Sequence, residues 1–361
     1  MSTLLCLQSR AKSLESRHGC GRQSVVEDTR VACKQDVLAL LERQKGHRIS
    51  GEAIASVLSV SRAAVWRAIK DLQAEGHAID ASTRVGYRLQ DSSDILSAEG
   101  IHPYLAPGFK GELICHPILD STNREVKRLA LEGAPQGTVV LAGQQTAGRG
   151  RNGRSFFSPS DTGIYLSMLL RPDLATSSAL LCTTAAAVAV CRAIDSLRGG
   201  STGIKWVNDI YIDGKKVCGI LTEGMAGFES GRIESIVIGI GVNYSTPLDA
   251  FPPELRDVAG SVFPGTIPAG VSRNRMAAAI INSLLDLVKQ LESANGFMAE
   301  YRSRSVVIGR EVRVLQGNQE YAAVAEEIDD AGALWVRTVN GERRLLNSGE
   351  ISLRPLDSPS W

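Results

Sequence analysis

The stretch "GIKWVNDIYIDGKKVCGILTE", residues 203–223, decides the fold of this 361-residue chain. Apolar and polar residues alternate on both sides of Asp213-Gly214, a dipeptide typical of the two-residue turn of a β-hairpin. The two segments that it joins are therefore expected to be antiparallel neighbours. Strands are predicted at 111–119, 138–145, 163–171, 204–212, 216–223 and 234–243, and helices at 121–132, 179–197 and 273–303. These elements predict an α+β domain with a mixed sheet, not a doubly wound parallel sheet.

The N-terminal part has the pattern of a winged helix-turn-helix. Residues 34–43 carry a helical stripe of leucine and valine, and Gly51–Leu58 form a second short helix with Val57 directed inward. Ser61 can cap a third helix. "GHAIDASTRVGYRL", residues 76–89, then alternates as a small hairpin would.

The chain is too long for one ordinary core, so several domains are expected. From about Val306 onward, the expected elements are short strands separated by turns, which predicts a small β-barrel of the SH3-like kind. "DSSD" at 91–94 has the composition of a linker. The expected organisation is a disordered tail at 1–33, a winged helix-turn-helix at 34–90, a central α+β domain at 95–305 and the β-barrel at 306–361.

Composition excludes several classes of protein. The formal net charge is +1, so no global excess of charge indicates a nucleic-acid or membrane partner. No run of about 18 apolar residues occurs, so no membrane span is expected. The cysteines are scattered without a CxxC pair, which indicates neither a disulfide framework nor a zinc site. This usage is typical of a reducing compartment, and we expect a cytoplasmic protein.

A loop rich in glycine and arginine, "GQQTAGRGRNGRSFFSP" at 143–159, is the first candidate site. Its G-x-G-x-x-G spacing is a weak dinucleotide signal, because two phenylalanines and Pro159 follow where a helix should begin. Glycines let backbone N–H groups turn toward an anion, and arginine side chains bind carboxylate or phosphate in a bidentate manner. On spacing alone, a polyanion-binding loop and a flexible segment that touches nucleic acid or nothing remain equally open.

Three further stretches place polar residues at the ends of expected elements. Lys205 lies in an apolar strand beside Trp206 and before Asn208-Asp209, where a cation can neutralise charge that develops on a phosphate. "DSTN" at 120–123 can cap a helix, and "GIGVN" at 239–243 ends a strand with glycines. Taken singly, each has a structural interpretation, as a solvated lysine, a helix cap and a bulge.

Together these stretches resemble the biotin protein ligase family. "DSTN", "QQTAGRGRNGR", "KWVNDIYIDGKKVCGILTE", "GIGVN" and the late "GEISLRP" at 349–355 match the family's motifs in order, over residues 35 to 356. With a winged helix in front, the chain is similar to the bifunctional group whose members are both ligase and repressor of the biotin operon. The resemblance implies a catalytic domain of the biotin/lipoate-ligase type at 95–305.

The resemblance implies two chemical steps and several partners. The biotin carboxylate attacks the α-phosphate of MgATP, which gives biotinyl-5′-AMP and pyrophosphate, and a lysine amine of a biotin carboxyl carrier protein then attacks the adenylate. The first step joins two anions, so a loop with several arginines suits it, and such a loop can exclude water from the labile anhydride. Mg²⁺ is expected mainly on the ATP phosphates, and no metal ligand is assigned. Operator DNA and a homodimer favoured by the adenylate are also implied.

Site residues carry over from the family motif by motif. The implied catalytic residues are Lys205, Arg149 and Arg151. The implied biotin-binding residues are Ser121, Thr122, Asn123, Gln145, Arg149, Gly150, Arg151, Lys205, Gly219 and Gly239. The implied nucleotide-binding residues are Arg151, Arg154, Phe156, Lys205, Asn208, Asn243 and Arg354. Two positions depart from the family, which usually has tryptophan at Phe156 and proline at Val207, and neither change removes a charge.

The N-terminal domain is expected to bind DNA. Residues 34–90 hold nine lysines and arginines against six acidic residues, an excess of three positive charges. With the apolar residues of the third helix directed inward, its other face would enter a major groove, and the wing would reach phosphates. The expected DNA-binding residues are Arg62, Ala63, Trp66, Arg67, Lys70, Arg84 and Arg88.

Two alternatives remain. A lipoate-type protein ligase shares the implied catalytic fold and an adenylation lysine, but such enzymes generally lack the arginine loop and the winged helix. A non-enzymatic transcription factor with a ligand-sensing domain would explain the winged helix, but the presence of both Lys205 and the arginine loop argues against it. Biotin-dependent exchange between ATP and pyrophosphate would separate the ligase from the sensor.

Overall fold

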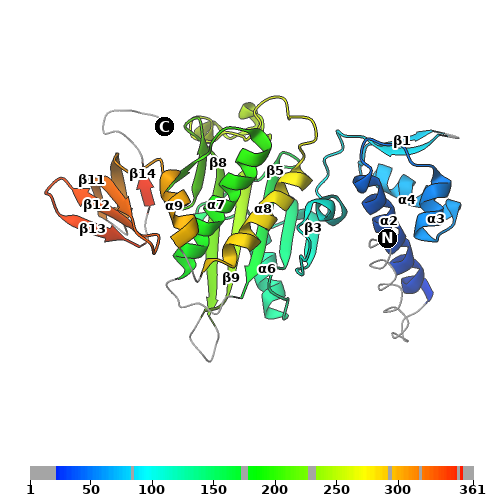
Figure 1. Ribbon diagram of the computed structural model, residues 1–361, viewed down its shortest axis with the longest axis horizontal. Helices are drawn as coiled ribbons and strands as arrows, with labels where there is room; N and C mark the ends of the chain where they lie inside the picture. The colour runs from blue at the N-terminus through cyan, green and yellow to red at the C-terminus, as the bar shows by residue number, and fades with distance from the viewer. Residues whose placement is uncertain are drawn as a thin grey trace. The chain divides into compact units, whose positions relative to one another are not determined.

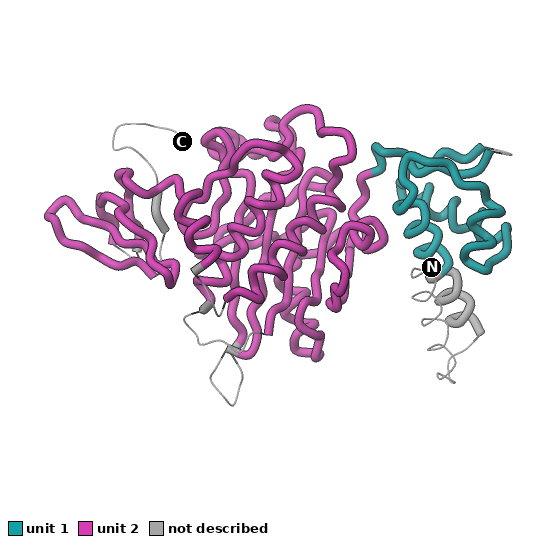
Figure 2. Tube along the Cα trace, viewed as in Figure 1, with its two compact units in different colours: residues 1–93 teal, residues 94–361 magenta. Residues whose placement is uncertain are grey.

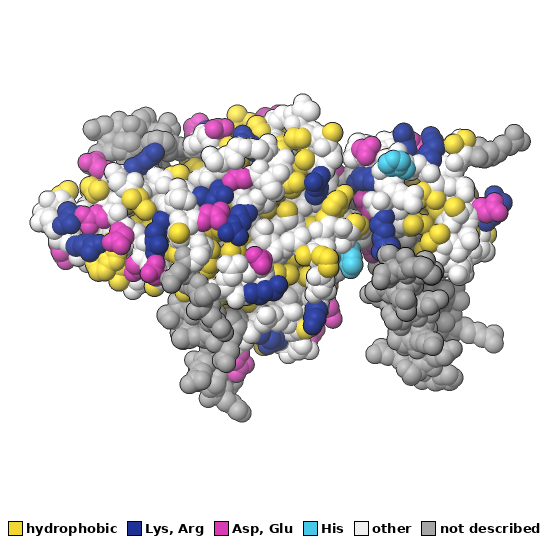
Figure 3. All heavy atoms as spheres, in the orientation of Figure 1, with side chains coloured by type: hydrophobic (Ala, Val, Ile, Leu, Met, Phe, Trp, Pro, Cys, Tyr) yellow, Lys and Arg dark blue, Asp and Glu magenta, His cyan; other side chains and the backbone are white. Residues whose placement is uncertain are grey.

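A computed structural model describes residues 22–82, 85–171, 178–226, 233–291, 295–316, 319–347 and 350–352. The chain divides into two compact units, Met1–Ser93 and Asp94–Trp361, which Figure 2 shows in different colours. Their boundary falls inside the stretch that was expected to be a linker. Each unit has a hydrophobic core of its own. Basic and acidic side chains are interspersed on the visible surface, in keeping with the small net charge (Figure 3).

The first unit is a winged helix-turn-helix, as expected. Its elements are α2 (Arg22–Arg43), α3 (Gly51–Leu58), α4 (Arg62–Ala74), β1 (Ile79–Ser82) and β2 (Gly86–Leu89), and the two strands pair antiparallel. The Ser61 hydroxyl accepts a hydrogen bond from the Ala64 backbone N–H at 3.1 Å and so caps α4. The buried residues of α4 are Val65, Ala68, Ile69 and Leu72.

Two details of this unit differ from the expectation. α2 begins at Arg22, so residues 22–33 are helical and the expected disordered tail does not reach residue 33. This segment contains neither glycine nor proline, and nothing in it stops a helix. Val57 is 59% exposed rather than buried, because the short α3 buries only Ile54 and Ala55.

The second unit is built on a seven-stranded mixed sheet (Figure 1). In spatial order its strands are β3 (Leu113–Leu119), β4 (Val139–Gln145), β5 (Gly163–Leu170), β9 (Ile233–Asn243), β8 (Lys215–Ala226), β7 (Asp209–Ile212) and β6 (Gly203–Lys205). β3 and β4 are parallel, and every other neighbouring pair is antiparallel. Asp213-Gly214 joins β7 to β8, which confirms the α+β prediction.

Helices cover both faces of this sheet. α7 (Ser178–Arg198) and α8 (Arg273–Val288) pack on one face, and α6 (Thr122–Leu131) packs on the other. Successive strand residues point to opposite faces. Leu141 therefore belongs to the core under α7 and α8, and its neighbour Val140 belongs to the core under α6. This second face positions the first turn of α6 beside the candidate site.

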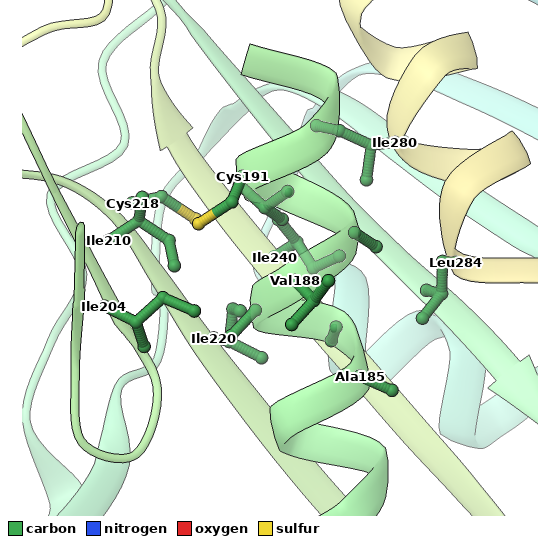
Figure 4. Packing of buried hydrophobic residues seen from close by; sticks show 14 of the residues in the cluster. Ala185, Val188, Cys191, Ile204, Ile210, Cys218, Ile220, Ile240, Ile280 and Leu284 are labelled. Atoms are coloured by element: carbon green, nitrogen blue, oxygen red, sulfur yellow. The ribbon is translucent and has the colours of Figure 1, made fainter. Parts of the chain in front are cut away.

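α7 is the central helix of the larger core. Its segment Ala179–Arg198 is long and apolar enough to cross a membrane by length and composition, but 67% of its most apolar window is buried inside the protein. Figure 4 shows Ala185, Val188 and Cys191 of α7 packed with strand residues such as Ile220. The apolar character of α7 is thus explained by its place in the core.

The C-terminal part forms a separate antiparallel sheet, as expected. α9 (Asn295–Ser303) leads into strands β10 (Glu311–Gln316), β11 (Gln319–Ile328), β12 (Leu334–Thr338), β13 (Arg343–Leu346) and β14 (Glu350–Ser352). Their order is β13-β12-β11-β10-β14. The indole N–H of Trp206 donates to the Gly332 carbonyl at 2.9 Å, which ties this sheet to the strands that carry the candidate site.

Two expected elements are each split in the structure. The segment 204–212 is not one strand, because a turn at 206–208 separates β6 from β7. That turn is anchored from outside the sheet, since the Tyr301 hydroxyl donates to the Val207 carbonyl at 3.0 Å. The Trp206–Val207 peptide bond is cis. The segment 273–303 is also two helices, α8 and α9, and α9 starts at Asn295-Gly296, residues typical of a helix boundary.

Candidate active site

One cavity is lined by the glycine-arginine loop, the first turn of α6, the turn between β6 and β7, and the glycines of β8 and β9. Every residue assigned to biotin from the resemblance lines this cavity, as do Arg154, Phe156 and Asn208 from the nucleotide set. These residues come from segments as far apart as Ser121 and Gly239. The fold therefore brings together motifs that each had an ordinary interpretation when taken alone.

A chain of hydrogen bonds forms the polar wall of the cavity. The Gln145 side-chain oxygen accepts from both the backbone N–H and the hydroxyl of Thr122, at 2.9 and 3.1 Å. The Gln145 amide nitrogen donates to the Ser158 hydroxyl at 3.0 Å. On the buried side, the Ser167 hydroxyl lies 2.6 Å from the side-chain oxygen of Asn123. Each polar side chain is thus held in a fixed orientation.

The first turn of α6 presents its polar residues to the cavity rather than using them as caps. Ser121 occupies the N-cap position, but its side chain makes no capping hydrogen bond. Thr122 and Asn123 are buried and form the contacts given above. The helix-cap interpretation of "DSTN" therefore does not explain these three side chains.

The glycine-arginine loop is itself a small hairpin. The Gly150 N–H donates to the Arg154 carbonyl at 2.7 Å, and the Arg154 N–H donates to the Arg151 carbonyl at 3.1 Å. Asn152 and Gly153 form the turn with φ values of 54° and 74°, the left-handed conformation of a type I′ turn. We expected only a pliable loop, and the Asn152-Gly153 dipeptide is the signal that predicts this hairpin.

The three arginines of the hairpin have different surroundings. Arg151 donates a hydrogen bond from Nη1 to the Asn208 side-chain oxygen at 3.0 Å. Arg149 is half exposed, and its Nη1 lies 3.8 Å from Oε1 of Glu223. Arg154 is exposed at the end of the hairpin. The loop therefore contributes three guanidinium groups to the lining of the cavity, and such groups bind carboxylate and phosphate well.

Two lysines line the cavity, and sequence reasoning selected only one of them. Lys205 ends β6, with its Nζ 5.9 Å from the centre of the Tyr211 ring. Lys216 of β8 places its Nζ 2.7 Å from Oδ1 of Asp209. Lys216 was missed because it lies close to a turn, where a lysine is usually solvated. Regular alternation would turn residues 216 and 219 to opposite faces of the strand, and a bulge between Lys216 and Cys218 brings both to the cavity.

Phe156 lies on a floor of glycines. A Cβ atom at Gly241 would lie 2.5 Å from the Phe156 ring, and one at Gly219 would lie 3.2 Å from it. Gly241 therefore lets the aromatic ring pack closely on the sheet, and a side chain at 219 would require Phe156 or Lys216 to shift slightly. Phe156 also packs against Tyr165, with ring centres 6.5 Å apart. An aromatic ring thus covers the cavity at the position where the family usually has tryptophan.

Glu223 was also missed, and it joins three cationic or polar groups beside the cavity. Its carboxylate accepts from Lys127 at 2.6 Å and from the Asn123 amide at 2.8 Å. Burial alone would raise the pKa of Glu223, but the hydrogen bonds from Lys127 and Asn123 and the charge of Arg149 hold the pKa below its ordinary value. The carboxylate is therefore ionised at neutral pH.

One residue of the nucleotide set lies outside the cavity, and another lies outside the described residues. Asn243 does not line the cavity, and its amide nitrogen donates to the Gly260 carbonyl at 3.0 Å. Asn243, at the end of β9, therefore uses its side chain to hold the loop backbone at Gly260 and does not line the cavity. Arg354 lies outside the described residues.

The cavity does not provide a resident metal site. Among the residues that the structure describes, no group of three or more His, Cys, Asp and Glu side chains could hold a metal ion. Asp209, the acidic lining residue, is paired with Lys216. This donor set does not fit a metal held by protein ligands alone.

The expected DNA-binding face of α4 is exposed. Arg62, Ala63, Trp66, Arg67 and Lys70 all lie on the solvent side of the helix, opposite its buried residues. Trp66 is 54% exposed, whereas tryptophan side chains are on average highly buried.

The wing presents less free charge than was expected. Arg88 donates to Oδ2 of Asp80 at 3.0 and 2.6 Å, so its charge is partly neutralised. Arg84 lies outside the described residues.

Comparison with known protein families agrees with this architecture. The Biotin/lipoate A/B protein ligase family matches residues 116–243, an HTH domain matches residues 34–88, and the Biotin protein ligase C terminal domain matches residues 307–354. The biotin protein ligase of Aquifex aeolicus in complex with biotin and ATP has a TM-score of 0.57 and 26% identity, over 67% of this chain and 98% of that chain. Fold and site thus define a biotin protein ligase with an N-terminal helix-turn-helix domain.

Full-length relatives narrow this class. The chain is 37% identical over 330 residues to the bifunctional ligase/repressor BirA of Bacillus subtilis. The aligned region covers 90% of this chain and 99% of that protein. It is 32% identical over 327 residues to the Escherichia coli protein of the same name, over 88% of this chain and 96% of that protein. The chain belongs to the bifunctional ligase/repressor family of biotin protein ligases.

Proposed function

We propose that this chain uses the described cavity to activate biotin with ATP and to transfer it to a lysine of a biotin carboxyl carrier protein. The observation that carries the proposal is the convergence of the complete biotin set on one cavity with three arginines and two lysines. The intermediate is biotinyl-5′-AMP. The helix-turn-helix unit represses biotin synthesis genes under control of that adenylate.

The polar wall binds the ureido ring of biotin in this proposal. Ser121, Thr122, Asn123 and Gln145 supply donors and acceptors on this wall, and the glycines at 219 and 239 let Phe156 and Asn123 lie close to the sheet. Buried polar groups of this kind select a ligand that can pair with all of them, because an unpaired group is costly.

The cations serve the first chemical step. A biotin carboxylate oxygen forms a bond to the α-phosphorus of ATP, and the bond from that phosphorus to the bridging oxygen of pyrophosphate breaks. Arg149 and Arg151 bracket the two anions, and Lys205 stabilises the charge that develops between them. Lys216 lines the same cavity and adds a second ammonium group. Mg²⁺ accompanies the ATP phosphates and offsets part of their charge.

The hairpin serves the second step. The lysine amine of the carrier attacks the acyl carbon of the adenylate, AMP leaves, and the amine loses a proton. Between the two steps the anhydride must be kept from water, and the loop with Phe156 covers it. Asn208 binds Arg151 at 3.0 Å and holds the loop across the cavity.

The proposal for the first unit is binding to a two-fold symmetric operator. The exposed basic residues of α4 would contact the major groove, and a homodimer promoted by the adenylate would present two such helices. A ligase and repressor of this kind would act in the cytoplasm, where its carrier and its operator are found.

Biotin-dependent exchange of labelled pyrophosphate into ATP tests the first step, and transfer of biotin to a carrier domain tests the second. The expected result is exchange that requires biotin and not lipoate. Exchange that requires lipoate would support the lipoate-type alternative, and the absence of exchange with either acid would support a non-enzymatic sensor.

A further inference from the structure

Glu223 lies just outside the cavity and contacts groups from two other segments. It belongs to β8, and its side chain is 20% exposed. Oε2 accepts from the Asn123 amide at 2.8 Å, and Oε1 accepts from Lys127 at 2.6 Å. The same Oε1 lies 3.8 Å from the Arg149 guanidinium of the hairpin. One carboxylate thus contacts α6 and lies near the arginine loop.

The contact with Asn123 fixes which end of its amide faces which way. The side-chain oxygen of Asn123 lies 2.6 Å from the Ser167 hydroxyl, and its nitrogen donates to Glu223 and, at 3.4 Å, to the Leu221 carbonyl. A rotated amide would place its oxygen against the carboxylate, which repels it. A carboxylate at 223 therefore allows only one orientation of the Asn123 amide.

Gly239 of β9 lies against the Asn123 side chain. A Cβ atom at Gly239 would overlap the Asn123 side chain, so the amide already fills the available space against the sheet. Asn123 can therefore not compensate for a lost partner by moving toward β9. Its position and orientation rest on Ser167 on one side and Glu223 on the other.

We propose that Glu223 is a positioning residue for the biotin-binding end of the cavity, which it serves by holding the Asn123 side chain in one position and orientation on the cavity wall. The inference rests on the proposed function. It differs from a purely structural role, in which Glu223 would only join α6 to β8 through its ion pair with Lys127. The ionised state of the carboxylate at neutral pH supports the donor role of the Asn123 nitrogen.

Three single variants separate these roles in the biotin-dependent exchange assay. Glu223→Ala removes the acceptor for Asn123, and we expect KM for biotin to rise about tenfold while KM for ATP and kcat change little. Glu223→Gln keeps a side-chain oxygen for Asn123 and should recover most of the biotin KM. Lys127→Met removes the ion pair alone, and its KM for biotin should stay close to that of the wild type.

A double-variant cycle with Asn123→Ala provides a second test. If Glu223 acts through Asn123, Glu223→Ala should add little to the biotin KM of an Asn123→Ala protein. The proposal would be overturned if the fold-increases in biotin KM of the two single variants multiply in the double variant. It would also be overturned if Glu223→Ala and Lys127→Met raise the biotin KM equally, or if Glu223→Gln recovers no more than Glu223→Ala. Thermal melts identify any variant that does not fold, and if Glu223→Ala is one of them, the comparison of Glu223→Gln and Lys127→Met with the wild type decides.

Failure of the proposed function gives a different result. A wild-type protein without biotin-dependent exchange would refute the ligase assignment before any variant is compared. An active wild type whose Glu223 variants behave otherwise than stated would refute only the role of Glu223.

Discussion

Arg151 and Asn208 join the two sides of the cavity, with 3.0 Å between Nη1 of the arginine and Oδ1 of the asparagine. Asn208 is itself fixed, because its amide nitrogen donates to the Ile220 carbonyl of β8 at 2.9 Å. The arginine at the turn of the hairpin is therefore anchored to the sheet by a neutral partner.

Arg151→Gly should impair retention of the adenylate more than folding. The hairpin keeps its Asn152-Gly153 turn, but it loses the guanidinium that orders it over the phosphate. We expect adenylate release to increase about 10- to 100-fold, the range for a lost hydrogen bond to a charged group. Released biotinyl-AMP would then acylate exposed lysines of a bystander protein, which mass spectrometry detects.

Asn208→Ala is the matched control for this variant. It removes the anchor and keeps the guanidinium, so its leakage should lie between those of the wild type and Arg151→Gly. If Arg151→Gly labels only the carrier lysine and binds the adenylate as the wild type does, the hairpin is not a phosphate clamp.

Lys205→Ala should reduce biotin-dependent pyrophosphate exchange by about 100- to 1000-fold, the scale seen when one preorganised charge is removed from a reacting centre. Unchanged secondary structure by circular dichroism would show that the loss is chemical. Lys216→Ala, measured beside it, removes a charge from the same cavity but also frees Asp209. Near-normal exchange by the Lys205 variant, with a large loss in the Lys216 variant, would transfer the proposed role to Lys216.

Gly239→Ala should weaken biotin binding without abolishing catalysis. The added methyl group would overlap the Asn123 side chain, so the polar wall must shift. We expect KM for biotin to rise about tenfold, in line with the cost of overpacking a tight site. Gly265→Ala is the control, since a Cβ there has no neighbour within 4 Å. Equal biotin KM values for both variants would contradict the close packing of Asn123 against β9.

The parts of this fold that follow from local chemistry could be predicted from sequence. Asp213-Gly214 fixed one antiparallel pair of strands, and Ser61 marked the start of the exposed helix of the first unit. The arginine loop and "DSTN" could be assigned to one site only through the family resemblance, because their contact depends on how separate strands pair in space.

The features that were missed depend on tertiary contacts. The segment 204–212 alternates like one strand, but its middle is a turn that Trp206 and Tyr301 tie to distant parts of the domain. Lys216 and Glu223 belong to a strand whose pattern looks ordinary, and their ion pairs are with Asp209 of β7 and Lys127 of α6, which come from other segments of the chain. Long-range pairing of this kind leaves no local signal in the sequence.

The helix-turn-helix unit should lose operator binding when Arg62 and Arg67 are both replaced by alanine. Both side chains are exposed on α4, away from its buried residues, so the change should leave the fold and biotin transfer intact. A gel shift with the upstream region of the chain's own biotin genes, with and without biotin and ATP, measures the effect. Arg128→Ala with Arg344→Ala removes the same charge from the other unit and serves as the control.

Salt dependence distinguishes direct phosphate or base contact from a general effect of charge. Each phosphate contact releases counterions from DNA, so wild-type binding should weaken steeply as salt rises. Loss of two contacts from α4 should lower the slope of log K against log salt by about two, and the control pair should leave the slope unchanged. If the Arg62 and Arg67 variant binds as tightly as the wild type with the same slope, α4 is not the DNA-binding helix. If the wild type does not bind its own upstream region even with biotin and ATP, the repressor role fails and the ligase role stands alone.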